Sequence, residues 1–600
     1  MDRNQLSQLY QQRANEFQVE AERLQSQYVF YSFVRLAVFL LWIGAIIILW
    51  NSFGWIVGAL SILLGLIGFA QFVFWHQRLA KNVQYHEHLS ALNGWEVQAL
   101  AGDFSGFGDG ERFVDAGHSY AFDLDIYGPH SLFQAMNRCV SILGEERLAQ
   151  FLGKAAAEEM IQQRQAAAKE LAEQMEWRHH FRATGMSVED DPADVEALLK
   201  WLHTPNVIRG QNPWRLFLFI APIFGLLSLI GMIIYFPAWW PVALILPNAW
   251  ALRQTTQTIT QLHEQTGRAA NLLDRYASIL AVLENYQPQS EYLQQVQKRF
   301  TEGASGSRAI KQLSNIIHQL NVRYNFFAVF LNLGFLWDFI WVNQLEGWKE
   351  KYRDQLPEWF DGLAEFEALI SLGNLTQNQT DWTFPTVGGT QVHGQNIGHP
   401  LIHPDKRVGN DLQLPAHGHI KLITGSNMAG KSTFLRSVGT NIVLATAGAP
   451  VCAKEFATPI LQVYTSMRTQ DALHENTSSF YAELKRLKFI IEAVKRQENI
   501  FFLLDEILKG TNSRDRHTGS KALIRQLIRD RGAGLVATHD LELGALAAES
   551  EGSVENWCIE VAIEDGKLRF DYLLKPGVSQ SFNATILMRQ MGIEIDPEDI

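Results

Sequence analysis

Cysteine and surplus positive charge are both lacking in this sequence, and each lack excludes a class of protein. Three cysteines occur in 600 residues, at positions 139, 452 and 558. Their wide separation excludes a disulfide framework and indicates reduced thiols facing a cytosol. The formal net charge is −12, whereas a protein that grips DNA over a broad face typically has a basic surplus. We also expect no secretory leader, because the polar start is too long and no small-residue cleavage site follows the apolar part.

Charged side chains are absent from two long stretches of the chain. Asp, Glu, Lys, Arg and His are all missing from residues 36–75 and from residues 216–252. A helix needs about 20 apolar residues to cross the ~30 Å hydrocarbon layer of a membrane. The first stretch predicts a transmembrane hairpin over residues 28–75, and the second predicts one over residues 214–252. The second half of the latter, Trp239–Leu252, is short and contains two prolines, so it is either a kinked span or a re-entrant segment.

Positive charge flanks both hairpins and is missing from both turns. The turns are expected at Asn51-Ser52 and between Tyr235 and Pro241. The flanking cations are Arg13, Arg23, Arg35, Arg78 and Lys81 for the first hairpin, and Arg209, Arg215, Arg253 and Arg268 for the second. The positive-inside rule then puts both turns outside and the rest of the chain in the cytoplasm. We therefore expect an integral protein of the inner or plasma membrane of a prokaryote.

A glycine-rich segment near residue 430 predicts a phosphate-binding loop. Its sequence, KLITGSNMAGKST, fits G-x-x-x-x-G-K-[ST] between the end of a buried strand and a stretch with helical apolar periodicity. The backbone N–H groups of such a loop and the following helix N-terminus attract phosphate. The predicted nucleotide-binding residues are Gly425, Ser426, Asn427, Met428, Ala429, Gly430, Lys431, Ser432 and Thr433. Lys431 is expected to reach the β- and γ-phosphates of ATP, and Ser432 to bind Mg²⁺.

Two later strands are expected to bring acidic and imidazole groups to the same place. The apolar run Asn499–Leu504 predicts a buried parallel strand, and Asp505 and Glu506 follow it. Residues 534–538 lead in the same way to His539. Ligands bind at the carboxyl edge of an open α/β sheet. Asp505 is therefore expected to hold Mg²⁺, and Glu506 to orient or deprotonate the attacking water, which predicts an ATPase.

These motifs resemble the ATPase domain of the MutS family of DNA mismatch repair proteins. The segments that carry the resemblance are Gly398-His-Pro400, Thr424–Thr433, Asp471–Leu484, Asp505–Asp515, Ala537–Leu543 and Tyr572–Phe582. The resemblance implies a homodimer through the ATPase domains, with DNA as a binding partner. It adds roles for Asn427 in the phosphate loop, Ser478 and Ser479 at the subunit interface, and His539 as sensor of the γ-phosphate. Catalytic roles then fall on Glu506, Lys431 and His539.

The expected fold is an α/β P-loop NTPase domain of the ABC and MutS type, joined to an all-α lever domain and two transmembrane helical hairpins. The lever is inferred from the resemblance. The expected boundaries are 1–27 for a polar helical N-terminus, 28–75 for the first hairpin, 76–121 for a linker, 122–213 and 253–384 for the two parts of the lever, 214–252 for the second hairpin and 385–600 for the ATPase domain.

Two further segments have alternative interpretations. Asp123 and Asp125 could suggest a metal site, but they lack further close ligands and favour a solvated strand. Residues 325–345 are apolar enough to suggest a fifth span. Because they contain Asn332 and Asp338, we expect a buried helix that packs the lever on the ATPase instead.

The residues and the resemblance together predict a membrane-anchored ATPase that binds and hydrolyses ATP at composite dimer sites and couples this to binding of mismatched or branched DNA. The Phe-x-Glu module with which the family reads mismatches is missing from the first hundred residues. The alternative is a membrane-tethered, ATP-driven scaffold that does not bind DNA. A transporter ATPase is disfavoured, because Asn476–Phe480 stands where that class carries Leu-Ser-Gly-Gly-Gln.

Overall fold

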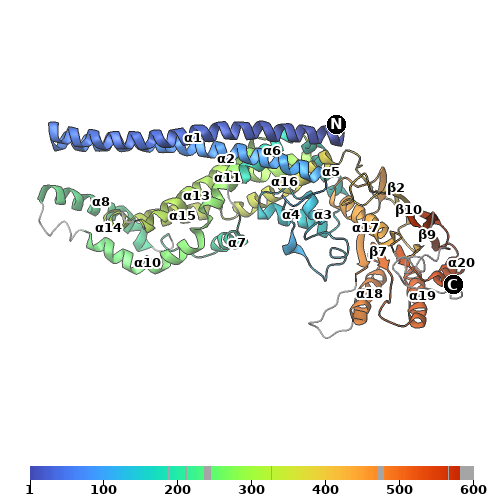
Figure 1. Ribbon diagram of the computed structural model, residues 1–600. Coiled ribbons are helices and arrows are strands. Elements are labelled where there is room, and N and C mark those ends of the chain that lie inside the picture. The colour runs from blue at the N-terminus through green and yellow to red at the C-terminus, as the bar shows by residue number, and fades with distance from the viewer. Residues whose placement is uncertain are drawn as a thin grey trace.

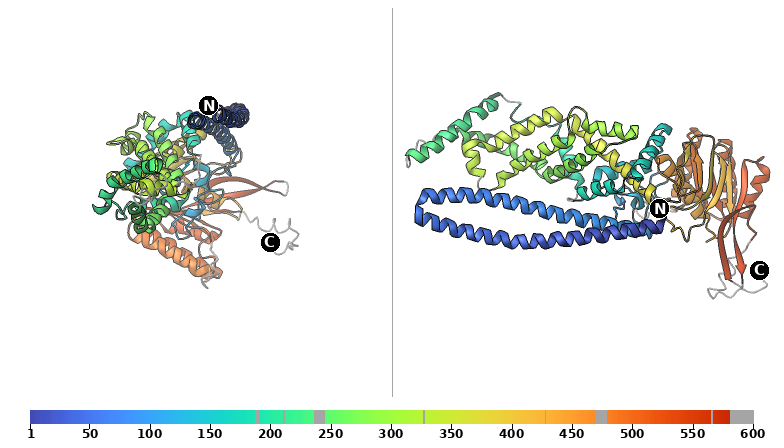
Figure 2. Two further views of the ribbon diagram at one scale, coloured as in Figure 1. Left: turned by 90° about the vertical axis from the view of Figure 1, so that its left-hand side faces the viewer. Right: turned by 90° about the horizontal axis from the view of Figure 1, so that it is seen from above.

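The computed structural model describes residues 1–186, 190–209, 212–235, 245–325, 328–426, 428–468, 479–564 and 567–580. The molecule is elongated: a long helical hairpin lies beside a helical body, and the β-sheets lie together at one end (Figure 1). Seen from above, the hairpin and the body both point away from the sheets (Figure 2). The C-terminal region is thus mixed α/β, and the region before it is mostly helical.

The hairpin consists of α1 (Arg3–Phe53) and α2 (Trp55–Leu100). Asp2 and Gln5 form a capping box at the start of α1, and Gly54, with φ of 85°, makes the turn. The turn therefore falls a few residues after the expected Asn51-Ser52. Residues 76–100, expected to belong to a linker, continue α2, because no proline interrupts them and their apolar side chains pack on the body. The apolar spans of α1 and α2 are only 0% and 6% buried.

The helical body is built around one long buried helix, α16 (Gln355–Asn378), in which nearly every side chain from Leu356 to Leu375 is buried. The other elements of the body are η1 (Glu111–Phe113), α3 (Leu132–Met136), α4 (Ile142–Gly153), α5 (Glu158–Ala172), α6 (Met175–Gly185), α7 (Pro192–Trp201), α8 (Asn212–Tyr235), α10 (Leu246–Thr266), α11 (Ala269–Asn285), α12 (Glu291–Thr301), α13 (Gly306–Asn321), η2 (Val322–Tyr324), α14 (Ala328–Phe335) and α15 (Trp337–Tyr352).

The second apolar stretch is part of this body. α8 covers most of the first half of the expected hairpin, whereas residues 236–244 lie outside the described part of the chain. α10 begins at Leu246 and continues to Thr266, so the end of the expected hairpin and the following lever helix are one element. Among the described residues, two helices, α1 and α2, are long and apolar enough to cross a membrane, or three spans are possible if the bent pair α14 and α15 counts as one.

Residues 325–345 do not form the single buried helix expected from the sequence. α14 and α15 meet at an angle of 79°. Leu336 between them has φ of 53°, in the left-handed region, which breaks the helix. α14 packs against α8, and Val329 and Phe330 are 61% and 63% exposed. The expectation of burial is therefore wrong for α14.

Two sheets form the C-terminal region. The smaller has the strand order β1-β5-β2-β3 and the larger β10-β9-β4-β8-β7-β6. In the larger sheet only the β9–β10 pair is antiparallel. The elements are β1 (Thr386–Val387), β2 (Gln391–Ile397), β3 (Asn410–Pro415), β4 (Ile420–Thr424), α17 (Lys431–Ala447), β5 (Glu455–Thr458), β6 (Gln462–Ser466), α18 (Ser479–Lys495), β7 (Ile500–Asp505), α19 (Ser513–Arg529), β8 (Ala533–Thr538), η3 (Leu541–Ala545), α20 (Leu546–Glu549), β9 (Val554–Glu564) and β10 (Lys567–Pro576).

Helices cover both faces of the larger sheet, which explains why β4, β7 and β8 are buried along their whole length. On one face, α17 lies between the sheet and the helical body, and Gly439 brings it close to both Leu503 and Leu124. On the other face, α18 and α19 contribute Ile490 and Ile524 to a separate apolar cluster. The carboxyl ends of β4, β7 and β8 therefore meet at one edge, next to the start of α17.

Candidate active site

The segment between β4 and α17 curls tightly around the start of the helix. Gly425 and Gly430 have φ of 154° and 97°, and Met428 has φ of 75°. A Cβ atom at Gly425 would also lie 2.6 Å from the carbonyl oxygen of Ile559. Glycine is therefore required there for both conformation and space. The loop surrounds the positive end of α17, where an anion is stabilised.

Lys431, the first residue of α17, points back into this loop. Its Nζ donates hydrogen bonds to the carbonyl oxygens of Gly425 at 2.8 Å and Ser426 at 2.9 Å. Burial lowers the pKa of Lys431, and the nearby carboxylates of Glu506 and Asp505 oppose that shift. The ammonium group thus fixes the shape of the loop and supplies positive charge inside it.

Asp505 ends β7 beside the start of α17. Burial raises the pKa of Asp505, and a hydrogen bond with Ser432 and the charge of Lys509 act in the opposite direction. Its Oδ1 is buried and has no hydrogen-bond partner among the described residues. A buried carboxylate oxygen with unused acceptor capacity, next to a serine hydroxyl, is a suitable ligand set for Mg²⁺, which prefers oxygen.

Glu506 follows in the left-handed region, with φ of 52°, and its backbone N–H donates to the carbonyl oxygen of Ala537 on β8 at 2.9 Å. Its carboxylate lies 3.4 Å from Lys509 Nζ and 3.6 Å from His539 Nδ1. Burial favours the neutral acid, but Lys509, His539 and Lys431 together lower the pKa of Glu506 below its ordinary value. Glu506 is therefore held as a carboxylate that can accept a proton.

One cavity of about 440 Å³ is lined by the phosphate loop, the start of α17 and Glu506, whereas Asp505 does not line it. The phosphate-loop side contributes Ser426, Met428, Gly430, Lys431, Ser432 and Thr433, and Glu506 closes one end. The rest of the lining combines the apolar side chains of Ile397, Ile402, Val408, Phe434 and Tyr572 with the polar ones of His399, Lys406, Asn410 and Ser437. The cavity thus offers polar groups for an anion and apolar side chains for an organic group.

The C-terminal region that contains this site is similar to known proteins. Residues 421–591 match the family model of MutS domain V. The C-terminal region of this chain belongs to the MutS family. A DNA mismatch repair protein MutS from Natronomonas pharaonis is 30% identical over 244 residues, covering 40% of this chain and 28% of the relative. MutS 2 from Haloarcula marismortui is 33% identical over 240 residues, covering 36% and 25%, and MutS from Aquifex pyrophilus is 35% identical over 220 residues, covering 36% and 25%.

The chain spans only between 25% and 28% of the length of these three relatives. The matched part contains the phosphate loop and both acidic residues. It contains neither the N-terminal hairpin nor the second apolar stretch. The similarity therefore applies to the C-terminal domain and gives no information about the two apolar stretches.

The structure brings most of the predicted site residues together in this MutS-type domain. Those in the loop, at the start of α17 and at the ends of β7 and β8 converge on one edge of the sheet: Gly425, Ser426, Met428, Ala429, Gly430, Lys431, Ser432, Thr433, Asp505, Glu506 and His539. Ala429 is 1% exposed and faces the core, away from the cavity. Asn427, Ser478 and the side chain of Ser479 lie outside the described residues.

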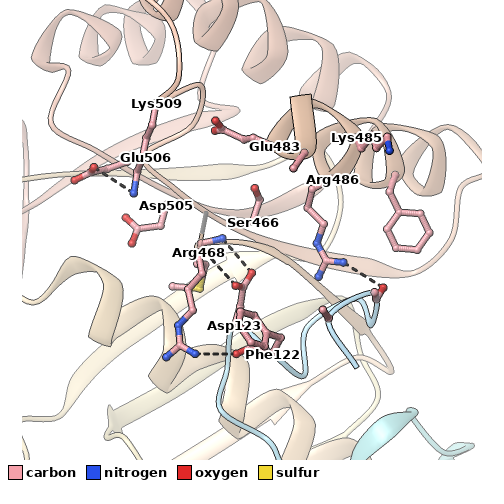
Figure 3. A pocket seen from close by; sticks show the side chains of 15 residues that line it. Phe122, Asp123, Ser466, Arg468, Glu483, Lys485, Arg486, Asp505, Glu506 and Lys509 are labelled. Carbon is pink, nitrogen blue, oxygen red and sulfur yellow. Dashed lines mark hydrogen bonds and ion pairs between the residues drawn. The ribbon is translucent and has the colours of Figure 1, made fainter. Parts of the chain in front are cut away.

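A second cavity of about 470 Å³ lies on the other side of Asp505 and Glu506, between β6, α18 and the segment that leads into the helical body (Figure 3). Asp123 crosses this junction and accepts hydrogen bonds from the backbone N–H groups of Met467 at 3.0 Å and Arg468 at 3.1 Å. Asp123 is only 5% exposed. The expected solvated strand is therefore wrong: the segment is a turn, and Asp123 caps the end of β6.

Arg486 on α18 ties the same segment down from the other side. Its guanidinium donates to the carbonyl oxygens of His118 and Ser119, both at 2.6 Å, and of Thr465 at 2.7 Å. Arg468 adds bonds to the carbonyl oxygen of Phe122 at 3.1 Å and the carboxylate of Asp125 at 2.8 Å. We call these bonds, with those of Asp123, the junction clamp. It joins the MutS-type domain to the helical body beside the second cavity, which Glu506 also lines.

Sequence reasoning missed the junction clamp. The bonds that cross between its two sides join residues more than 340 positions apart, as in the Asp123 bonds to Met467 and Arg468. Arg486 directly follows Lys485 and looks like one of a solvated pair. The only local signal is the pair of aspartates at 123 and 125, for which the sequence favours a solvated strand.

Proposed function

We propose that this chain is a membrane-anchored ATPase of the MutS family, with a P-loop NTPase domain over residues 385–600. The observation that carries the proposal is the convergence of Ser426, Lys431, Ser432 and Glu506 on one cavity, with Asp505 beside it. This arrangement supports ATP, whose phosphates would bind the loop and the N-terminus of α17. The apolar side chains of the lining would then take the base and ribose.

Ser432 and Asp505 are the residues that would hold Mg²⁺, and the buried, unpartnered Oδ1 of Asp505 supports this assignment. The ion would neutralise charge on the phosphates. Lys431 would add its positive charge on the β- and γ-phosphates, in exchange for its present hydrogen bonds to loop carbonyls. Glu506 would orient the attacking water and accept its proton, and its lowered pKa keeps it ready to do so. His539, next to Glu506, would sense the γ-phosphate.

A homodimer through the ATPase domains completes the proposed site. Met428, which lines the cavity, is 71% exposed, and Tyr481 on α18 is 52% exposed. A second copy of the domain would cover them, and Ser478 and Ser479 would reach the partner's nucleotide, as the family resemblance implies. ATP binding would close the dimer, and hydrolysis would reopen it.

The hairpin over residues 28–75 supports membrane anchoring, because its apolar spans are almost wholly exposed. The spans from Leu36 to Phe53 and from Trp55 to Trp75 are roughly 27 and 31 Å long at 1.5 Å per residue, which matches the ~30 Å hydrocarbon layer. With both turns outside, as the flanking cations require, the ATPase faces cytoplasmic ATP. The lever parts, 122–213 and 253–384, would carry the dimer motion towards the membrane and the second hairpin, 214–252.

The proposed ATPase is tested by two substitutions in detergent-solubilised full-length protein. Lys431→Ala is expected to abolish nucleotide binding, and Glu506→Gln to preserve binding but stop turnover. Lys488→Ala, an exposed lysine on α18, is the matched control and should behave as the wild type. ATP binding by equilibrium filtration and phosphate release check these outcomes. Wild-type turnover in Glu506→Gln would contradict its assignment as the base.

DNA, mismatched or branched, is the partner that the family resemblance supports. A second candidate, a membrane-tethered ATP-driven scaffold that does not bind DNA, is favoured by the net charge of −12 and by the apolar surface at the end of the body. Binding of homoduplex, mismatched and branched DNA, measured with and without ATP at several salt concentrations, separates the two. Phosphate contacts impose a steep loss of affinity with salt. If no salt-sensitive binding of DNA is found, the scaffold is the candidate function that remains.

A further inference from the structure

The helical body carries an apolar surface at the end farthest from the nucleotide site. α14 and the turn before it expose Tyr324, Val329 and Phe330. Its neighbours expose Ile220, Ile223, Leu226, Leu227 and Ile230 on α8, and Leu246 and Trp250 on α10. Figures 1 and 2 show that α8, α10 and α14 lie at the same end of the molecule as the closed end of the α1–α2 hairpin. A bilayer that receives the hairpin would therefore lie at this end of the body too.

The contact between α8 and α14 is made by glycine. A Cβ atom at Gly225 would lie 1.6 Å from the carbonyl oxygen of Gly334, so the two backbones touch. Contacts of this kind, through small residues, are typical of helix pairs in membranes, where burial of apolar surface does not drive association. In water, by contrast, a helix this apolar would gain most by burying Val329 and Phe330, which remain exposed.

The N–H groups at the bend after α14 find partners inside the protein, whereas Oδ1 of Asn248 and Oδ1 of Asp338 have no hydrogen-bond partner among the described residues. Asn248 is fully buried, and its side-chain amide donates to the carbonyl oxygen of Leu333 at 2.8 Å. Asn332 accepts a hydrogen bond from the backbone N–H of Asp338 at 2.9 Å and so caps α15. Hydrocarbon requires such internal partners, because it offers none for a broken helix. Asn332, which argued against a membrane location in the sequence, thus stabilises the bend itself.

Charge returns immediately beyond the bend. Asp338, 4% exposed, pairs with Arg323 at 3.5 Å, and both lie on the body side of α14. α14 has eight residues and is about 12 Å long, which is too short to cross a ~30 Å layer. The 79° bend then directs α15 into the body. The segment can enter a membrane only from one side and only to a shallow depth.

We propose that α14 is a lipid-facing, non-spanning segment that seats the end of the helical body in the cytoplasmic leaflet of the bilayer, alongside α8. The inference rests on the proposed membrane anchoring and deepens it, because it places in lipid the end of the helical body that the ATPase would move. Its occupant is a phospholipid bilayer, because its exposed surface is apolar, continues onto α8, which has no charged residue after Arg215, and lies level with the exposed hairpin.

The test measures the depth of single labelled cysteines in full-length protein reconstituted in phosphatidylcholine and phosphatidylglycerol nanodiscs. Cys139, Cys452 and Cys558 are first replaced by alanine, and ATP turnover must survive this change. Phe330→Cys reports on α14, Ile47→Cys on the hairpin and Tyr481→Cys on the nucleotide-site domain, each labelled with the environment-sensitive dye NBD. Lipids carry a nitroxide quencher at either carbon 5 or carbon 12 of the acyl chain. Val329→Cys serves as a second reporter if Phe330→Cys does not fold.

The label at 330 is expected to lose fluorescence to the carbon-5 quencher much more than to the carbon-12 quencher, and the label at 481 to neither. The label at 47 should be quenched by the deep probe. No quenching at 330 with quenching at 47 overturns the inference and leaves the anchor intact. No quenching at either position overturns the anchor itself. Stronger quenching at 330 by carbon 12 overturns the shallow placement, and protection from water without lipid quenching indicates a protein partner or a second copy instead.

Discussion

The two apolar regions of this molecule are attached to it in opposite ways. The first, the α1–α2 hairpin, is fixed at its base: Glu96 on α2 is fully buried, lies 2.7 Å from Arg138 and 2.8 Å from Arg182, and accepts a bond from Asn378 at 2.8 Å. Tyr10 on α1 donates to the same Asn378 at 2.9 Å. The distal part of the hairpin is almost wholly exposed.

The second region, α8, α10 and α14, has no such separate base. α10 is at once the end of the apolar stretch and a helix of the body, and α14 is followed at once by α15. In the proposed function, the first region is the membrane anchor and the second is a part that moves. Asn378 ends α16, shortly before β1, so the hairpin is held where the MutS-type domain begins. The second region is reached only through the length of the body, so any motion of the body changes its position relative to the hairpin.

The largest expected effect comes from breaking the base of the hairpin. Glu96→Ala leaves Arg138 and Arg182 buried without their counter-ion, which should destabilise the folded state by roughly 3–5 kcal/mol. Thermal unfolding and limited proteolysis of the purified protein measure this loss. A change limited to the hairpin, with the body still protected, would sharpen the contrast. An unchanged melting temperature would contradict it.

The pH dependence of the stability gives a second test of the role of Glu96. Burial alone would raise the pKa of Glu96, but Arg138 and Arg182 hold it below its ordinary value of 4.5. A carboxyl group with a lowered pKa stabilises the fold above its unfolded value and loses that contribution as pH falls through the folded one. Stability should therefore fall with pH below about 4.5 in the wild type, and this part of the dependence should vanish in Glu96→Gln.

The site was predictable from sequence to a greater degree than the attachments. The loop at 425–433 is contiguous, and its strand, glycines and helix start fix each other's geometry locally. Asp505 and Glu506 follow because parallel strands end at one edge. By contrast, Asp123 and Glu96 look like ordinary polar residues until partners hundreds of positions away are known. The bend at Leu336 was hidden for the same reason, since periodicity reports apolar content and not where a helix breaks.

The next prediction concerns the junction clamp, which joins the candidate active site to the helical body that carries the second apolar region. Asp123→Asn should weaken the junction clamp by roughly 1.5–3 kcal/mol, because a charged acceptor of two backbone N–H groups becomes a neutral one. Hydrogen exchange of residues 462–468 should then accelerate. Asp125→Asn is the control: its carboxylate is 38% exposed and pairs with Arg468 and Arg436 at the surface, so at most ~1 kcal/mol is expected. Equal exchange in both variants would mean that Asp123 does not hold the end of β6.

The smallest effect should come from the contact inside the second region, and it separates packing from helix propensity. Gly225→Ala places a methyl group against the carbonyl oxygen of Gly334, an overpacking that costs about 1–3 kcal/mol. Alanine recovers ~0.5–1 kcal/mol of helix propensity in α8, which offsets only part of that cost because the clash is with backbone atoms. Gly334→Ala, on the other helix, meets nothing within 4 Å and should be neutral or stabilising. Hydrogen exchange over residues 328–335 in nanodiscs should rise in Gly225→Ala alone, with the hairpin unchanged. A rise in exchange in Gly334→Ala and not in Gly225→Ala would mean that α14 is not held by α8.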